Sequence, residues 1–299
     1  MRNSLKLSMA RRPVAILAAI AATALSLGIA PVTHAGAATL RVCADPNNFP
    51  FSDRAGEGFE NKIAALTAQA LGEGLSYTWS RQDHDFFRRT LDAGTCDAVM
   101  SVPNQLESVE RTQPYYESSY VFVSRADRDL DISSIKDKRL KQVKIGIELI
   151  DPQGFTTPPG QMLAERGIVA NAVGYPIYDI KRLGDGRARM IADVAKGKLG
   201  LAAICGPGAG YFVRHSAVPL QMLPIGDTEE FSTHKVKFKL FALQYDIAMA
   251  VRKGDDARRA MLDRVIAEHK PQITDILKSF GVPLVEPLQA SLSHGLAAD

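Results

Sequence analysis

The stretch TLRVCADPNNFP, residues 39–50, begins the pattern on which the fold depends. Its first half, Thr39–Ala44, alternates in polarity and is rich in β-forming residues, which predicts a strand. Its second half, Asp45–Pro50, carries turn-forming residues and ends that strand. Apolar residues recur at helical spacing over Phe59–Leu71, so we expect a helix there, closed by Gly72.

The alternation of strands and helices continues along the chain and restarts after an interruption. A charged stretch over residues 125–144 differs in composition from both of its flanks, which indicates a crossing into a second lobe. Such an alternation predicts mostly parallel sheets covered by helices. We expect further strands at 75–80, 97–102, 120–123, 143–148, 169–173 and 199–205, and helices at 85–91, 159–167 and 187–196.

The last part of the sequence is expected to return to the first lobe. Residues 238–251 form the longest β-like run in the chain, and helices are expected at 255–270 and 271–280. The first lobe is short of helices to cover its sheet, so these two are assigned to it. The fold class predicted is α/β, with two lobes, each a mixed sheet covered by helices, joined by two crossover strands. The expected division is 1–37 signal peptide, 38–123 first lobe, 124–225 inserted second lobe, and 226–299 return and completion of the first lobe.

The N-terminal segment has the three parts of a secretory signal peptide. Four cationic residues are followed by an uncharged run from Val14 to Ala30, and small residues then offer cleavage near Ala35 or Ala37. An uncleaved membrane anchor is the alternative. Cleavage would change the formal charge of +3 to −1, which gives no electrostatic basis for nucleic-acid binding. We therefore expect an exported, periplasmic protein without stable membrane insertion.

No pattern for catalysis, a metal or a cofactor is found in the sequence. The six His are scattered, no Cys-x-x-Cys occurs among the three Cys, and no nucleophile elbow of the form Gly-x-Ser-x-Gly is present. The glycine-rich Gly206–Gly210 follows a predicted strand but lacks the Lys-Ser/Thr pair of a phosphate-binding loop. We therefore expect neither an enzyme nor a cofactor. The glycines that begin at Gly206 are expected either to let two backbones approach or to shape the rim of the second lobe.

The order of elements resembles the type II periplasmic solute-binding proteins of ATP-driven importers. Gly58-Phe59-Glu60 resembles the Gly-Phe-Asp/Glu signature that opens the first helix of that family, and Pro114-Tyr115 resembles the start of its first crossing. The resemblance covers essentially the whole mature chain. It implies a type II periplasmic binding protein fold with a ligand cleft between the lobes.

A narrower resemblance is to the MoxJ/XoxJ group, the binding-protein-like accessory family found with quinoprotein dehydrogenases. It is carried by residues 41–48 (RVCADPNN), 56–63 (GEGFENKI), 94–97 (GTCD) and 206–212 (GPGAGYF). Membership implies a partner, a dehydrogenase of methanol or another alcohol that uses pyrroloquinoline quinone (PQQ), and a role in its activation or maturation. Cys43 and Cys96 fall in these motifs and on strands expected to be neighbours, so a disulfide is expected, unless the register leaves them staggered.

The cationic residue of amino-acid receptors is absent from its usual place. In the importer family an Arg stands ten residues before the Tyr of the Pro-Tyr motif and pairs with the ligand carboxylate. In this chain that position is Gln105, so an ordinary α-amino acid is not expected as ligand. Arg81, at the end of a neighbouring strand, is the candidate replacement.

Other residues are assigned to a cleft that binds a ligand or a partner. Asp45 and its neighbouring asparagines have an Asx turn as the alternative. Glu60 is assigned to the cleft on the family pattern, with a simple helix start as the alternative. The tyrosines have packing between the lobes as their alternative, and Thr156 has helix capping. The assigned residues are Asp45, Asn47, Asn48, Phe51, Glu60, Arg81, Asn104, Gln105, Tyr115, Tyr120, Thr156 and Gly206.

Two functions of different classes remain. The first is an accessory factor that interacts with a PQQ-dependent alcohol dehydrogenase and assists it. The second is a receptor that captures a small polar solute, other than an ordinary α-amino acid, for an importer. A fold-related enzyme such as a dehydratase is a third alternative, because fold alone does not fix function.

Overall fold

The computed structural model describes residues 38–151, 153–177, 185–226, 232–233, 236–237 and 243–285. The predicted signal peptide, residues 1–37, lies outside these residues, and so does the start of the predicted β run, residues 238–242. Within the described ranges, none of the helices is both long and apolar enough to cross a membrane.

The first lobe is built on the strand and helix that open the mature sequence. Strand β1 (Thr39–Ala44) pairs in parallel with β4 (Gly74–Trp79), and helix α1 (Phe59–Leu71) covers them. Gly72 ends α1 in the left-handed conformation, with φ of 66°, where glycine is favoured. The smaller elements of this lobe are β2 (Asn47–Asn48), β3 (Ser52–Asp53), α2 (Phe86–Arg89), β5 (Val99–Pro103) and β6 (Glu110–Arg111).

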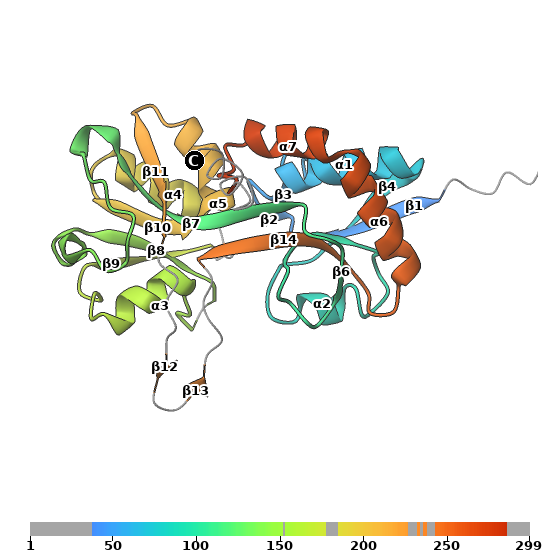
Figure 1. Cartoon of the computed structure of the whole chain (residues 1–299), viewed down its shortest axis with the longest axis horizontal. Coiled ribbons are helices and arrows are strands. Elements are labelled where there is room, and N and C mark those ends of the chain that lie inside the picture. The colour runs from blue at the N-terminus through green and yellow to red at the C-terminus, as the bar shows by residue number, and fades with distance from the viewer. Residues whose placement is uncertain are drawn as a thin grey trace, which may run out of the picture. The chain divides into compact units, whose positions relative to one another are not determined.

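Two long strands connect the lobes. The first four residues of β7 (Tyr116–Arg125) pair with β14 (Gln244–Val251), and the rest of β7 pairs with β10 (Leu201–Cys205) and β11 (Leu220–Pro224). In Figure 1, β7 and β14 run side by side through the middle of the molecule. The expectation from composition that the charged stretch 125–144 makes the crossing is therefore wrong, whereas the family resemblance, which placed the start of the first crossing at Pro114-Tyr115, agrees with β7. An apolar strand makes the crossing instead, because a crossing strand passes through both cores, whereas the charged residues belong to surface turns and two short 3-10 helices, Ala126–Arg128 and Lys138–Gln142.

The second lobe repeats the parallel arrangement. Strands β10, β8 (Ile145–Leu149) and β9 (Ala172–Pro176) are parallel neighbours. The strand expected at 169–173 begins three residues later, because Val169 lies in the preceding turn and is 60% exposed. The remaining elements of this lobe are α3 (Pro158–Glu165), α4 (Gly186–Ala195) and α5 (Gly206–Arg214), and a separate pair of short strands is formed by β12 (Ser232–Thr233) and β13 (Val236–Lys237).

The glycine-rich segment 206–210 is helical, and its glycines let two backbones approach, which is one of the two expectations from the sequence. It forms the first turns of α5, where a proline at the second helical position suits a helix start. The glycines allow a close approach between the lobes, because a Cβ atom on Gly210 would lie 2.2 Å from the carbonyl oxygen of Gly281. These glycines therefore serve packing.

The last two helices return to the first lobe, as the sequence predicted. Helix α6 (Asp256–Glu268) and helix α7 (Lys270–Ser279) contribute Leu262 and Ile273 to the same hydrophobic core as Phe59 of α1. Figure 1 shows α1, α6 and α7 gathered on the first lobe. The mixed-sheet, two-lobed architecture predicted from the sequence is thereby confirmed.

A disulfide connects Cys43 of β1 to Cys96, which precedes β5. The two Cα atoms are 5.5 Å apart, and both residues are buried. The backbone N–H of Cys43 donates a hydrogen bond to the carbonyl oxygen of Ala98, so the two segments are adjacent. Cys205 is a free cysteine.

Removal of this disulfide should destabilise the protein without changing its fold. We expect the Cys43→Ser/Cys96→Ser double variant to lose roughly 2–4 kcal/mol of unfolding free energy, because the bridge closes a loop across a separation of 53 residues. Chemical denaturation followed by circular dichroism measures this loss. Cys205→Ser is the matched control and should lose less than the double variant; an equal loss would contradict a stabilising role for the bridge.

Candidate site between the lobes

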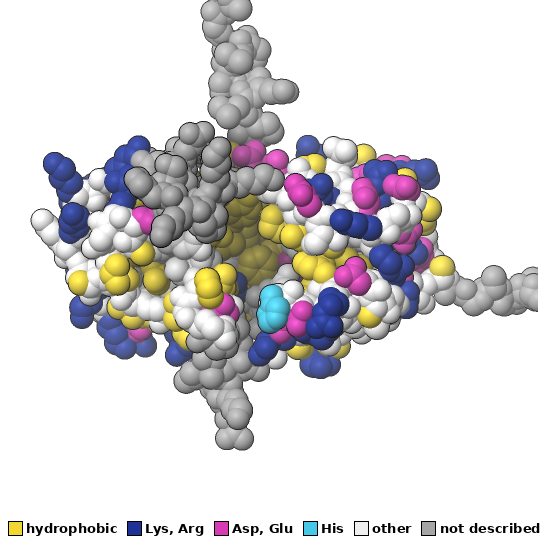
Figure 2. All heavy atoms as spheres, turned by 90° about the horizontal axis from the view of Figure 1, so that it is seen from below, with side chains coloured by type: hydrophobic (Ala, Val, Ile, Leu, Met, Phe, Trp, Pro, Cys, Tyr) yellow, Lys and Arg dark blue, Asp and Glu magenta, His cyan; other side chains and the backbone are white. Residues whose placement is uncertain are grey.

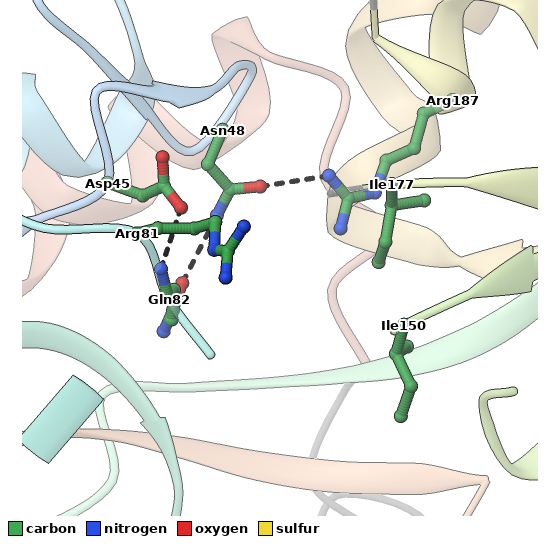
Figure 3. Close-up of a pocket in the computed structure, with 7 residues that line it drawn as sticks. All are labelled: Asp45, Asn48, Arg81, Gln82, Ile150, Ile177 and Arg187. Atoms are coloured by element: carbon green, nitrogen blue, oxygen red, sulfur yellow. Dashed lines mark hydrogen bonds between the residues drawn. The ribbon is translucent and has the colours of Figure 1, made fainter. Parts of the chain in front are cut away.

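A cavity of about 150 Å³ lies between the lobes. Figure 3 shows its lining residues, which come from loops at the ends of β1, β4, β8 and β9, from the short strand β2 and from the start of α4. Loops that follow parallel strands gather at one edge of a sheet, which explains why segments distant in sequence meet here. The lining residues are Asp45, Asn48, Arg81, Gln82, Ile150, Ile177 and Arg187.

The carboxylate of Asp45 accepts hydrogen bonds from the backbone of two loops. One oxygen accepts the backbone N–H of Asn47 at 2.9 Å, and the other accepts the backbone N–H of Gln82 at 2.8 Å. The first of these bonds is the Asx turn that the sequence left as an alternative. Asp45 therefore joins the loop after β1 to the loop after β4, and it lines the cavity while doing so.

Arg187 carries a hydrogen bond from one lobe to the other. Its Nε donates to Oε1 of Glu148 at 2.8 Å within the second lobe, and its Nη1 donates to Oδ1 of Asn48 in the first lobe at 2.9 Å. Its guanidinium also lies 5.2 Å from the centre of the Phe51 ring. Burial lowers the pKa of Arg187, but Glu148 and Asp185 more than offset this, so the pKa is raised overall and the charge is kept.

The partner of Arg187 is a fully buried carboxylate. Glu148 has an exposed fraction of 0%, and its second oxygen, Oε2, accepts the backbone N–H of Cys205 at 3.0 Å. A buried charge is tolerated only when it is paired and hydrogen-bonded, and both oxygens of Glu148 meet that condition.

Arg81 is the more exposed cation of the cavity. Its guanidinium pairs with Asp83 at 3.1 Å, and its side chain remains 55% exposed. In Figure 3 its side chain lies beside the cavity, between Asp45 and Arg187. Gln105, which stands at the position of the usual carboxylate-binding Arg, is exposed on the loop after β5 and is not among the residues that line the cavity.

The carboxyl group of Glu60 has a strongly raised pKa. Burial raises its pKa to about 7, and the charge of Asp45 adds to this rise. A hydrogen bond with Ser101 and the charge of Arg187 oppose the rise without cancelling it. Glu60 stands in the first turn of α1 and interacts with groups of both lobes, since Arg187 belongs to the second.

The other residues assigned from the sequence lie outside the lining of this cavity. The Tyr115 hydroxyl donates to the carbonyl oxygen of Met100 at 2.8 Å in the first-lobe core, and Tyr120 packs against Tyr245. The Asn104 N–H donates to the carbonyl oxygen of Asp246, and the Thr156 hydroxyl donates to the carbonyl oxygen of Thr157 at 3.3 Å rather than capping α3. The remaining assigned residues are Asn47 in β2, Phe51 beneath the Arg187 guanidinium, and Gly206, the first residue of α5.

Sequence reasoning missed the second-lobe half of this site. Ile150, Ile177 and Arg187 line the cavity, and none of them belongs to a recognisable motif. A signal existed for Glu148, because an acidic residue stands in the otherwise apolar strand GIEL, and a charge in a buried strand requires a partner.

A hollow between the two halves of the molecule is visible in Figure 2, with hydrophobic-class side chains, a class that includes Tyr, in its depth. On the crossing strands, Tyr120 of β7 packs against Tyr245 of β14, and both are half-buried. The hydroxyl of Tyr245 lies 3.0 Å from Sγ of Cys205, and burial raises the pKa of that thiol to about 11.

Comparisons with known proteins give one consistent result. The model of the bacterial extracellular solute-binding proteins, family 3, matches residues 40–281. Protein MoxJ of Methylorubrum extorquens is 36% identical over 258 residues, which cover 83% of this chain and 82% of that protein. The crystal structure of MxaJ from Methlophaga aminisulfidivorans MPT has a TM-score of 0.69 at 28% identity, covering 82% of this chain and 100% of that one. The periplasmic binding protein XoxJ from Methylobacterium extorquens AM1 has a TM-score of 0.63 at 33% identity, covering 83% and 99%.

The raised pKa of Glu60 predicts that the protein loses stability as the pH rises. Between its ordinary pKa of 4.5 and the folded value of about 7, the folded state holds a proton that the unfolded state has released. The free energy of unfolding therefore falls across this window and then levels. In Glu60→Gln the neutral amide removes this fall, so the variant should gain on the order of 2 kcal/mol over the wild type between pH 5 and pH 8.

Denaturation curves of both proteins at intervals of pH measure this gain. Glu57→Gln, at an exposed position near the start of the same helix, is the control and should follow the wild type. A constant difference between Glu60→Gln and wild type across this pH range would contradict the prediction.

Proposed function

The chain belongs to the bacterial extracellular solute-binding proteins of family 3, in the MoxJ/XoxJ group, and from this premise we propose that it is a periplasmic accessory factor. In this role it interacts with a PQQ-dependent methanol or alcohol dehydrogenase and assists the activation or maturation of that enzyme. The MoxJ/XoxJ relatives support a binding-protein-like role associated with methanol oxidation.

The observation that carries this proposal is the state of the cleft. Its polar groups are engaged by the chain itself: Asp45 by two backbone N–H groups, and Arg187 by Glu148 and Asn48. A receptor for amino acids needs a cation free to pair with the ligand carboxylate, and Gln105 stands at that position. A cleft occupied in this way favours a protein partner over a captured solute.

A second function has one observation in its favour. Arg81 lines the cavity, and more than half of its side chain is exposed, so its guanidinium is accessible to a small anionic or polar ligand. A solute receptor of an importer that uses Arg81 is therefore the alternative, for a ligand other than an ordinary α-amino acid.

Native mass spectrometry of the mature protein with the quinoprotein dehydrogenase of its own organism tests the first function. We expect a specific complex with that enzyme, and no additional small-molecule mass on the free protein. Enzyme activity is then measured with and without this protein and should be higher with it. The absence of a complex, together with a discrete extra mass on the free protein, would contradict the proposal and favour the solute receptor.

Arg81→Ala separates the two functions in the same experiment. If the chain is an accessory factor that contacts the enzyme through its outer surface, the variant should still form the complex, because Arg81 lines the cavity between the lobes. If the chain is a receptor, the variant should lose a bound mass that the wild type retains. Asp83→Asn, which keeps the Arg81 guanidinium and removes the charge of its partner, is the matched control.

A further inference from the structure

We propose that the cleft contains a guanidinium-binding site that is already occupied by the chain's own Arg187. The site consists of the Glu148 carboxylate, the Asn48 side-chain oxygen and the face of the Phe51 ring. When the Arg187 side chain is removed, this site should bind a free guanidinium cation. The proposal concerns the isolated protein and goes beyond the proposed function, which can fail independently of it.

The three contacts match the chemistry of a guanidinium and not that of a compact ammonium. Nε and Nη1 of Arg187 donate to two different acceptors, Glu148 at 2.8 Å and Asn48 at 2.9 Å, as a planar fork allows. The Phe51 ring centre lies 5.2 Å from the central carbon, within the range of a cation–π contact. A single Nζ atom lacks this fixed arrangement of donors.

The fold leaves room for this guanidinium by means of a glycine. A Cβ atom on Gly208 would lie 2.8 Å from both Cδ and Nε of Arg187 and 3.4 Å from Cε2 of Phe51. Gly208 stands in the first turn of α5, where other residues favour a helix more than glycine does. Glycine at position 208 therefore leaves free the space that the side chains of Arg187 and Phe51 occupy.

The walls of the site have support that does not depend on Arg187. Phe49, from the same loop as Asn48 and Phe51, packs edge-on against Tyr211 of α5 with ring centres 4.7 Å apart, and it also approaches Phe280 of the first lobe. Glu148 is held by the backbone N–H of Cys205. Because these contacts remain after the loss of one side chain, we expect the site to stay formed.

Arg187 makes the contact between the lobes that a bound solute would otherwise make. In a solute receptor, the bound solute makes contacts to both lobes and stabilises the closed state. Here Arg187 is anchored on the second lobe by Glu148 and reaches Asn48 on the first. The lobes are therefore held together in the absence of a solute.

Chemical rescue of Arg187→Ala tests the proposal. The variant leaves Glu148 buried without its partner, so its Tm should fall by roughly 10 °C. Guanidinium chloride at millimolar concentration, well below denaturing levels, should raise the Tm of the variant. Isothermal titration calorimetry should give one site with a Kd of roughly 1–10 mM. The wild type should show neither effect, because its site is filled.

Three controls decide whether the binding occurs at this site. Methylammonium chloride at equal ionic strength should not rescue Arg187→Ala. Adding Glu148→Gln to Arg187→Ala should abolish guanidinium binding, because the carboxylate is lost. Arg258→Ala removes an Arg–Glu pair with Glu73 that lies, among the described residues, entirely inside the first lobe, and this variant should gain no comparable binding.

Two outcomes would overturn the proposal: no guanidinium binding to folded Arg187→Ala, or equal binding to Arg258→Ala. If Arg187→Ala does not fold, Gly208→Ala is the second variant, because its added methyl group displaces Arg187 while keeping the charge. Folded Gly208→Ala should then have a lower Tm than the wild type, although alanine favours a helix over glycine. An unchanged or higher Tm would overturn the proposal.

Discussion

The arrangement of the cleft depends on one buried ion pair, that between Glu148 and Arg187. A carboxylate with no exposed surface requires both a cation and hydrogen-bond donors, and the structure supplies these through Arg187 and the backbone N–H of Cys205. Because Glu148 stands on β8 and Arg187 on α4, the pair fixes the place where the second lobe faces the first. Asn48 and Phe51 then meet a guanidinium whose position is already set.

This pair links the fold to the proposed role. A solute-binding fold presents loops of both lobes to a cleft, where a ligand ordinarily supplies the contact between them. In this chain the contact is made by a side chain, and Phe49 with Tyr211 adds an apolar contact beside it. When the polar groups of the cleft are hydrogen-bonded by the chain itself, the two lobes can present a stable surface to a partner protein. This agrees with the similarity of the chain to MoxJ and XoxJ proteins.

The sequence predicted the framework well and the site only in part. Periodicity identified the parallel strands and helices of both lobes, because burial on one face leaves a repeating pattern. Composition misplaced the crossing at residues 125–144, because a charged surface segment also differs in composition from its flanks, whereas the family resemblance placed the start of the crossing at Pro114-Tyr115. The close backbone approach that was one expectation for Gly206–Gly210 is present, within a helix. Asp45, Asn48 and Arg81 were assigned because they follow strands, and all three line the cavity. Arg187 was missed because no local pattern shows that a helical arginine reaches a residue almost 140 positions away.

The claim that the chain holds its own lobes together is tested most directly by a distance between them. Two exposed residues, Lys196 of the second lobe and Arg264 of the first, are replaced by Cys in a Cys205→Ser background and carry nitroxide spin labels. Double electron–electron resonance then measures the distance between the two labels. For purified protein without any solute, the account predicts one narrow distance distribution, which broadens when Asn48 is replaced by Ala. A broad or two-state distribution that narrows only after small molecules from the periplasm are added would contradict it.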